Sequence, residues 1–234
     1  INYFEPVTAW ACKTQKIESV SLSHQAAFKS KKVPRPNTID WGKLILSHYA
    51  PTTHHVGFHF ERYDDYIYTP VIRSEIRALT PTNLGHYTVY LPALSDHNIL
   101  RLLRQIPGVR WEVFSKHTGY SYAVGNVFVQ PINNEKFNDS LASGQGLFTG
   151  GGFEGPAEAL FLGKKLLVAP MKFQYEQQCN AFALKKLGIP VIWASTQNWL
   201  PVIKQFVNES QTHQFNFPDE TASIVAKVVG DFAR

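Results

Sequence analysis

Residues 149–160 read TGGGFEGPAEAL, in which the end of an apolar run is followed by three glycines and then by a helical pattern. Glycine has no side chain, so the backbone N–H groups of such a run can approach a ligand closely. Pro156 suits the first turn of a helix, where its missing N–H is not needed. Backbone N–H groups and a helix dipole at one turn predict a phosphate-binding site. A tight strand-to-helix turn without a ligand is the alternative that the glycines alone leave open.

The segments around this stretch predict an α/β domain with a parallel sheet. Strands are expected where apolar and β-branched residues run together, and helical patterns lie between them. The expected strands are 87–91, 109–114, 127–130, 146–149, 166–169 and 191–194, and helices are expected over 95–105 and 221–232. Strands that alternate with helices of ordinary length are typical of a parallel sheet covered on both faces, as in a Rossmann-like domain.

The first third of the chain predicts a separate unit. A helix is expected over 6–16, an apolar run follows over 17–22, and an extended segment over 66–73 leads out of the unit. The chain starts abruptly at Ile1 with an apolar run, and we interpret it as starting within a domain. The predicted organisation is the latter part of an N-terminal domain and a linker over 1–79, and a Rossmann-like domain over 80–234.

Composition narrows the class of protein. The chain has 234 residues, of which 44% are hydrophobic and 18% charged, and this suits a globular protein without a membrane-spanning run. Cys12 and Cys179 lie far apart and have no C-x-x-C partner, so neither a disulfide framework nor a zinc site is predicted, and a reducing, cytoplasmic setting is the simpler interpretation. The net charge of +5 is compatible with anionic ligands or an anionic membrane surface, and it is too small to imply nucleic acid.

Acidic and amide side chains follow the glycine run at two places. Glu158 lies about one helical turn beyond the glycines, where a carboxylate can accept hydrogen bonds from two ribose hydroxyls. A polar group over residues 174–180, QYEQQCN, opens the next expected helix. Carboxylates and amides side by side suit sugar hydroxyls, because each hydroxyl both donates and accepts. A polar helix cap is the alternative for this second group.

The segment GGFEGPAEALFLGKKLLVAP over 151–170, followed by EQQCNA, resembles the donor site of GT-B glycosyltransferases related to family 28 and the UDP-glucuronosyltransferases. YFEP at 3–6 and SHQ at 23–25 resemble segments in the N-terminal domain of bacterial and archaeal glycosyltransferase-like proteins. The resemblance implies an α/β, GT-B-like fold with two Rossmann-like domains, the N-terminal one incomplete in this chain. It also implies inverting transfer of a sugar from a nucleotide donor, above all a UDP-sugar, to an unknown acceptor, lipid-linked or saccharide.

The same resemblance implies roles for particular residues. Glu158 would bind the ribose, residues 151–155 the diphosphate, Glu176 and Gln177 the donor sugar, and residues 128–132 would lie along the base. The full expected donor-binding set is Gly151, Gly152, Phe153, Glu154, Gly155, Glu158, Glu176, Gln177, Asn180, Gln130 and Ile132. No metal and no other cofactor are expected, because a helix N-terminus and nearby donors would carry the charge of the leaving diphosphate. The absence of an Asp-x-Asp motif agrees with this expectation.

His24 and Glu5 are the candidates for the base that deprotonates the acceptor hydroxyl. Each follows an apolar, strand-like run, so its side chain is expected to face the cleft between the two domains. A structural or acceptor-contacting role is the alternative for His24.

Two further groups of residues are weaker candidates for a functional site. Four histidines have no carboxylate or cysteine in register, so we expect a solvated or acceptor-facing loop rather than a metal site: His48, His54, His55 and His59. A basic run is expected to be a solvated loop, with anionic lipid headgroups, a peripheral membrane contact or a lipid-linked acceptor as the alternative: Lys29, Lys31, Lys32 and Arg35. Trp41 and residues 44–46 either extend that surface or belong to the core.

Two other functions stay open at this point. A UDP-sugar 2-epimerase on the same fold would need additional acidic and basic groups around the sugar. A nucleotide-sugar-binding protein without turnover would lack the base.

Overall fold

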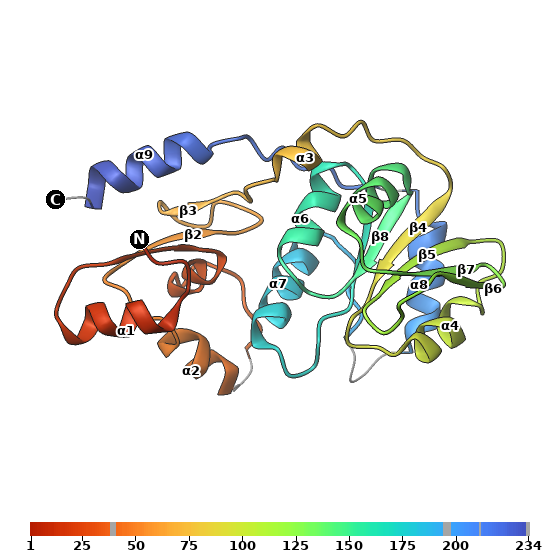
Figure 1. Cartoon of the computed structure of the whole chain (residues 1–234), viewed down its shortest axis with the longest axis horizontal. Helices are drawn as coiled ribbons and strands as arrows, with labels where there is room; N and C mark the ends of the chain where they lie inside the picture. Colours follow the sequence, from red (N-terminus) through yellow and green to blue (C-terminus); the bar gives the residue numbers. More distant parts are fainter. Residues whose placement is uncertain (38–40, 194–197, 211, 233–234) are drawn as a thin grey trace.

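The computed structural model describes residues 1–37, 41–193, 198–210 and 212–232, and it contains two α/β units (Figure 1). The first unit has a parallel sheet in the order β1-β2-β3, extended by a parallel bridge between Asn2 and Ser21. Its strands are β1 (Val20–Ser23), β2 (His54–Phe58) and β3 (Ile67–Tyr68). Its helices are α1 (Pro6–Thr14), the 3-10 helix η1 (His24–Lys29) and α2 (Trp41–His48).

The second unit has a sheet in the order β6-β7-β5-β4-β8-β9, in which only β6 is antiparallel to its neighbour. The strands are β4 (His86–Tyr90), β5 (Arg110–Ser115), β6 (Tyr122–Val124), β7 (Val127–Pro131), β8 (Gly146–Thr149) and β9 (Lys165–Val168). Numbered along the chain, the parallel strands have the spatial order 3-2-1-4-5, which is that of a dinucleotide-binding Rossmann fold. Val191 forms a parallel bridge to Val168 in the place of a sixth strand.

Apolar side chains cover both faces of the second sheet. Leu147 and Phe148 are consecutive on β8 and belong to different apolar clusters, because neighbouring residues of a strand point to opposite faces. The cluster around Leu147 includes residues of α6 and α7, and the cluster around Phe148 includes residues of α4 and α8. The helices are α4 (Asp96–Leu103), α5 (Asn134–Ser143), α6 (Glu154–Phe161), α7 (Tyr175–Lys186) and α8 (Trp199–Asn208). The parallel sheet is therefore buried on both sides, as the apolar strand sequences predict.

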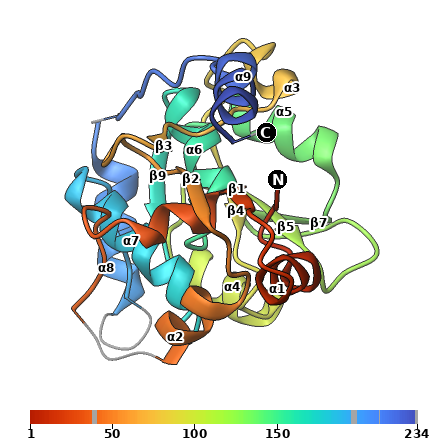
Figure 2. The same cartoon turned by 90° about the vertical axis from the view of Figure 1, so that its left-hand side faces the viewer.

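The linker and the last helix join the two units. The short helix α3 (Ser74–Arg77) lies between β3 and β4, and α9 (Thr221–Phe232) returns to the first unit (Figures 1 and 2). Ile224 and Val228 of α9 pack against Val20, Leu22 and Val56 of the first sheet. The predicted division at residue 80 therefore does not describe α9, because its apolar stripe is buried by strands far away in the sequence. None of the described helices is long and apolar enough to cross a membrane.

Five predicted strands, 87–91, 109–114, 127–130, 146–149 and 166–169, agree with observed strands to within one residue at each end. The predicted strand 191–194 lies partly outside the described residues. The prediction of an extended strand over 66–73 is wrong beyond Tyr68, because Pro70 has no N–H for a sheet and Arg73 already precedes α3. The prediction of a loop at His54 and His55 is also wrong, since both residues lie in β2.

Candidate functional site between the two units

The glycine run lies where the strand order of the second sheet reverses. β4 and β8 are neighbours, and Tyr90 is paired with Thr149 at their carboxyl ends. The hydroxyl of Thr149 donates to the carbonyl oxygen of Tyr90 at 3.1 Å, and Gly150 follows directly. In open α/β sheets, ligands bind in the crevice outside the carboxyl ends at this switch point. The fold thus places the predicted phosphate turn where such sheets bind nucleotides.

Gly151 is required by close packing. A Cβ atom on Gly151 would lie 2.5 Å from the carbonyl oxygen of Gln177, far inside van der Waals contact. The N–H of Gly151 donates to Oε1 of Gln177 at 3.1 Å, and the N–H of Met171 donates to the same oxygen at 3.1 Å. Gln177 therefore ties the glycine turn to the loop before α7. Within the described chain, the backbone N–H groups of residues 152–155 have no such partner and remain for a ligand.

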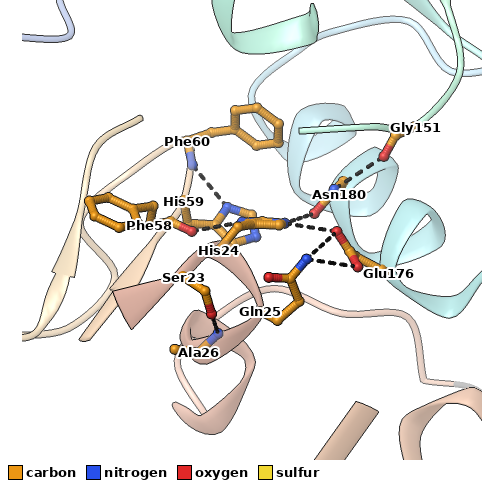
Figure 3. Close-up of polar contacts among 10 residues, drawn as sticks. All are labelled: Ser23, His24, Gln25, Ala26, Phe58, His59, Phe60, Gly151, Glu176 and Asn180. Carbon is orange, nitrogen blue, oxygen red and sulfur yellow. Dashed lines mark hydrogen bonds and ion pairs between the residues drawn. The ribbon is translucent and has the colours of Figure 1, made fainter. Parts of the chain in front are cut away.

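His24 reaches this turn from the first unit (Figure 3). Its Nδ1 lies 2.8 Å from the carbonyl oxygen of Phe58, and its Nε2 lies 2.8 Å from Oδ1 of Asn180. A backbone carbonyl can only accept, so it holds the proton on Nδ1 and leaves the lone pair of the neutral ring on Nε2, which faces α7. The ring of Phe153 stacks on the ring of His24 with their centroids 3.8 Å apart.

Asn180 and Glu176 complete the contact from α7. Asn180 is fully buried, and its Nδ2 donates to the carbonyl oxygen of Gly151 at 3.1 Å, which turns Oδ1 toward His24. Oε1 of Glu176 lies 3.9 Å from Nε2 of His24. Nε2 of Gln25 donates to both carboxylate oxygens of Glu176 at 3.3 Å. We call His24, Gln25, Phe153, Glu176 and Asn180 the interdomain cluster, and Figure 3 shows its members other than Phe153.

Burial controls the ionisation of His24. It lowers the pKa of the imidazole below its ordinary value, and the Glu176 carboxylate, the Phe58 carbonyl and the Asn180 amide oppose this shift. The net direction favours the neutral ring at neutral pH, which is the form that a base requires. In that form Nε2 and Oδ1 of Asn180 are two acceptors 2.8 Å apart with no proton between them. An acceptor hydroxyl can donate to Nε2 only after Asn180 moves away from it, because the single lone pair of the neutral ring points at Oδ1.

His59 is a neighbour of the cluster, whereas the sequence predicts it in a solvated or acceptor-facing loop. It is fully buried, and its ring centroid lies 5.2 Å from that of His24. Its Nδ1 accepts the N–H of Phe60 at 2.9 Å, while its Nε2 has no partner within the described chain. Burial lowers the pKa of His59 well below its usual range. The alternation of Val56, Phe58 and Phe60 is typical of a strand with one buried face, but it places His59 on the opposite face, so the local pattern does not indicate the burial of His59.

A second close-packed glycine positions β2 against η1. A Cβ atom on Gly57 would lie 2.5 Å from both Cα and the backbone nitrogen of Ala27. The two backbones can touch only without that atom, and this contact brings the carbonyl of Phe58 to His24.

Glu158 is buried in α6 and paired with the linker. Nε of Arg73 donates to Oε1 of Glu158 at 2.7 Å, and Nη2 donates to Oε2 at 3.0 Å. Nη2 also donates to Oδ1 of Asn138 at 3.3 Å. Burial raises the pKa of Glu158, and Arg73 opposes this shift. Both carboxylate oxygens are thus engaged by Arg73, and the ribose contact of Glu158 stays a prediction.

Replacing Arg73 by methionine is expected to lower the free energy of unfolding. The change leaves the Glu158 carboxylate buried without its partner, and we expect a loss of about 2 kcal/mol, discounted because the Arg73 side chain is 35% exposed. The melting temperature Tm would then fall by about 4 to 8 °C. Because burial raises the pKa of Glu158, the folded variant takes up a proton more readily than the unfolded chain, so the deficit shrinks as the pH falls from 7 toward 5.

Arg62→Met is the matched control, since Arg62 pairs with Glu220 at the surface. We expect less than about 1 kcal/mol for this pair. Equal losses in the two variants, or a deficit for Arg73→Met that does not change with pH, would contradict the buried role of Arg73 and Glu158.

Glu5 is not part of the interdomain cluster. It caps α1, where its carboxylate accepts from the N–H groups of Val7 and Thr8 at 2.8 Å and from the Thr8 hydroxyl at 2.6 Å. These hydrogen bonds stabilise the carboxylate and lower the pKa of Glu5, which weakens it as a base. The structure thus gives Glu5 a capping role, although the apolar run before it resembles that before His24.

The remaining expected donor residues lie along the same edge of the second sheet. Gln130 is buried near the end of β7, and Ile132 is exposed just beyond it. Two strands, β5 and β4, separate β7 from β8, so these residues lie on the order of 14 Å from the glycine turn. Glu154 is exposed at the start of α6. Within the described residues, no three His, Cys, Asp or Glu side chains converge as metal ligands.

The two sheets therefore present the carboxyl ends of their strands to each other. His24 follows β1 and contacts α7, and the turn that follows β8 contacts His24. Two Rossmann-like units that face each other in this way, with the last helix returning to the first unit, define a GT-B glycosyltransferase fold. The profile of glycosyl transferase family 1 matches residues 1–210, and the chain belongs to this family.

Solved structures agree with the fold. The spinosyn forosaminyltransferase SpnP is similar with a TM-score of 0.50 and 14% identity, over 95% of this chain and 69% of that one. UGT89C1 of Arabidopsis thaliana, complexed with UDP-L-rhamnose, is similar with a TM-score of 0.55 and 14% identity, over 97% of this chain and 62% of that one. The chain spans only 42% of the glycotransferase of kitacinnamycin. A comparison with curated proteins gives no match.

Proposed function

We propose that this chain binds a UDP-sugar between its two units and that the protein transfers the sugar to an acceptor hydroxyl. The observation that carries the proposal is the position of His24. Its Nε2 comes from the first unit and faces Glu176 and Asn180 beside a glycine turn at the switch point of the second sheet. A base, a carboxylate for sugar hydroxyls and free backbone N–H groups for a diphosphate thus lie at one junction.

The proposed reaction is a single displacement. The acceptor oxygen bonds to the anomeric carbon, the bond from that carbon to the diphosphate oxygen breaks, and UDP leaves with the electron pair. Nε2 of His24 takes the acceptor proton. The N–H groups of residues 152–155 and the dipole of α6 stabilise the charge on the leaving diphosphate, so this proposal needs no metal. Attack on the face opposite UDP inverts the anomeric carbon.

The other expected contacts have places in this proposal. Glu176 would accept hydrogen bonds from the sugar, Glu158 would approach the ribose, and Gln130 and Ile132 would lie along the base. The structure of UGT89C1 is described with a bound UDP-sugar, and this supports UDP among the nucleotides. The ring of Phe153 covers His24, so an acceptor reaches Nε2 only when Phe153 or one of the units moves.

Two adjacent glycines give a sharp test of the diphosphate site. A Cβ atom on Gly152 would meet nothing within 4 Å, whereas one on Gly151 would overlap Gln177. We expect Gly152→Ala to leave thermal unfolding unchanged and to weaken UDP binding by about tenfold, because the methyl group enters the diphosphate space. Gly151→Ala is expected to lose about 1 to 3 kcal/mol of stability as well. Calorimetric titration with UDP, ADP, GDP and TDP and a thermal melt measure both effects.

The outcomes separate the candidate functions. If Gly152→Ala binds UDP as tightly as the parent protein does, the proposed diphosphate site is wrong. With UDP-sugar and an acceptor panel, a new glycosidic linkage supports transfer, whereas an epimerised sugar supports a UDP-sugar 2-epimerase. Binding of UDP-sugar without either product supports a nucleotide-sugar-binding protein.

A further inference from the structure

A cavity of about 440 Å³ adjoins the interdomain cluster on the side of the first unit. Its walls come from η1, α2 and the start of α7, and its volume is within the range of small-molecule sites. Gln25 lines the cavity and also donates to both carboxylate oxygens of Glu176. Tyr175, the residue before Glu176, lines it as well. The cavity therefore opens next to the position proposed for the donor sugar.

The charged residues that line this cavity are all basic: Lys29, Arg35 and Lys43. Nζ of Lys29 donates to the carbonyl oxygen of Ser47 at 2.6 Å, and Arg35 donates to the carbonyl oxygens of Phe28 and Ser30. These carbonyl contacts hold the side chains but do not neutralise them. Among the described residues no carboxylate forms an ion pair with any of the three, whereas Lys32 of the same basic run pairs with Asp64. Three cations without a carboxylate partner among the described residues, around one cavity, favour an anionic ligand.

The rest of the lining is apolar. Phe28 forms part of the wall and is buried, together with Tyr175, in an apolar cluster that spans both units. Leu44 and Leu46 of α2 also line the cavity, and Leu44 is 53% exposed. The exposed side chains of Trp41 and Ile45 continue this apolar surface along α2. An occupant that contacts these residues carries an apolar body beside its charge.

We propose that this cavity binds the acceptor, and that the acceptor carries a phosphate or carboxylate group joined to an apolar chain. The acidic group lies among Lys29, Arg35 and Lys43, the apolar chain lies along Leu44, and the attacking hydroxyl points toward the interdomain cluster. The acceptor role rests on the proposed function, whereas the preference for an acidic, apolar ligand rests on the cavity alone.

The test uses small probes and the whole chain. Hexyl phosphate and hexanoate carry the two acidic groups, hexanol is the neutral analogue, and inorganic phosphate has no chain. We expect hexyl phosphate or hexanoate to bind about tenfold more tightly than hexanol. Arg35→Gln and Lys43→Gln are expected to weaken that binding by about tenfold each. Lys31→Gln is the matched control, because Lys31 belongs to the same basic run and does not line the cavity.

The comparison between hexyl phosphate and hexanoate shows which acidic group the cavity prefers. Leu44→Ser is expected to weaken the binding of hexyl phosphate and to leave the binding of inorganic phosphate unchanged, since only hexyl phosphate has an apolar chain. Equal binding of hexanol, or binding of both acidic probes that is insensitive to Arg35→Gln and Lys43→Gln, would overturn the proposal. UDP is titrated separately on the same protein. Probe binding with the expected pattern but without UDP binding would support the cavity and reject the transferase.

Discussion

Replacing His24 by glutamine is expected to lower turnover by about 100- to 10 000-fold, the usual contribution of a general base. Glutamine can still donate to the Phe58 carbonyl or to Asn180, but it cannot accept a proton from the acceptor. UDP affinity is expected to stay within about twofold, because the proposed diphosphate site consists of backbone N–H groups of residues 152–155 and does not include His24. Steady-state kinetics and calorimetry with UDP separate the two effects.

The pH dependence makes this prediction specific. Burial lowers the pKa of His24, and a base acts only when it is unprotonated, so turnover of the parent protein rises with pH through a pKa below the ordinary value of 6.5. His55→Gln is the control, since His55 lies in β2 outside the interdomain cluster and its Nδ1 lies 3.0 Å from the hydroxyl of Thr52. A His24→Gln variant that keeps its turnover, or one that loses UDP binding together with its turnover, would falsify the role of His24 as base.

Replacing Glu176 by glutamine is the second change with a large expected effect. Its carboxylate is 25% exposed at the junction and is held by Gln25, so it is available to sugar hydroxyls. A hydrogen bond to a charged group contributes about 1.5 to 3 kcal/mol, and we therefore expect kcat/KM for the UDP-sugar to fall about 10- to 100-fold. Binding of UDP alone is expected to change little, because UDP lacks the sugar.

The same variant also tests the link to His24. The Glu176 carboxylate raises the pKa of His24, so its removal lowers that pKa further and moves the acid limb of the pH profile to lower pH. Glu135→Gln is the matched control, because Glu135 is an exposed carboxylate in the first turn of α5, as Glu176 is in the first turn of α7. An acid limb that does not move, with kcat/KM unchanged, would show that Glu176 acts on neither the sugar nor His24.

The strands of the second unit could be predicted because each is a short apolar run that both faces of the sheet bury. β8 and β9 are such runs, and the three glycines after β8 indicate a turn in the sequence. The need for glycine at position 151 could not be predicted. Its N–H donates to Gln177 and a side chain there would overlap Gln177, which lies 26 residues further along the chain. The wrong extension of the strand at 66–73 has a local cause, Pro70, that was visible in the sequence.

The candidate site divides in the same way. His24, Glu176 and Asn180 were recognisable as chemical side chains, but the sequence placed His24 and Glu5 on equal terms as bases. Only the packed structure separates them, because Glu5 is used by the first turn of its own helix while His24 contacts residues 34 and 156 positions away. His59 lies just beyond the end of β2, as a predicted loop allows, but its burial depends on rings that include the distant Phe153.

The sequence by itself determined the alternation of strands and helices, the glycine turn and the residue types at the junction. These are local properties, since periodicity, glycine content and helix caps depend on neighbouring residues. The tertiary structure alone decided that α9 returns to the first sheet, that Arg73 pairs with Glu158, and that a basic cavity adjoins Glu176. Each of these depends on which distant surfaces bury one another. The hydrophobic effect is non-directional, so the sequence of one segment does not specify the partner that buries it.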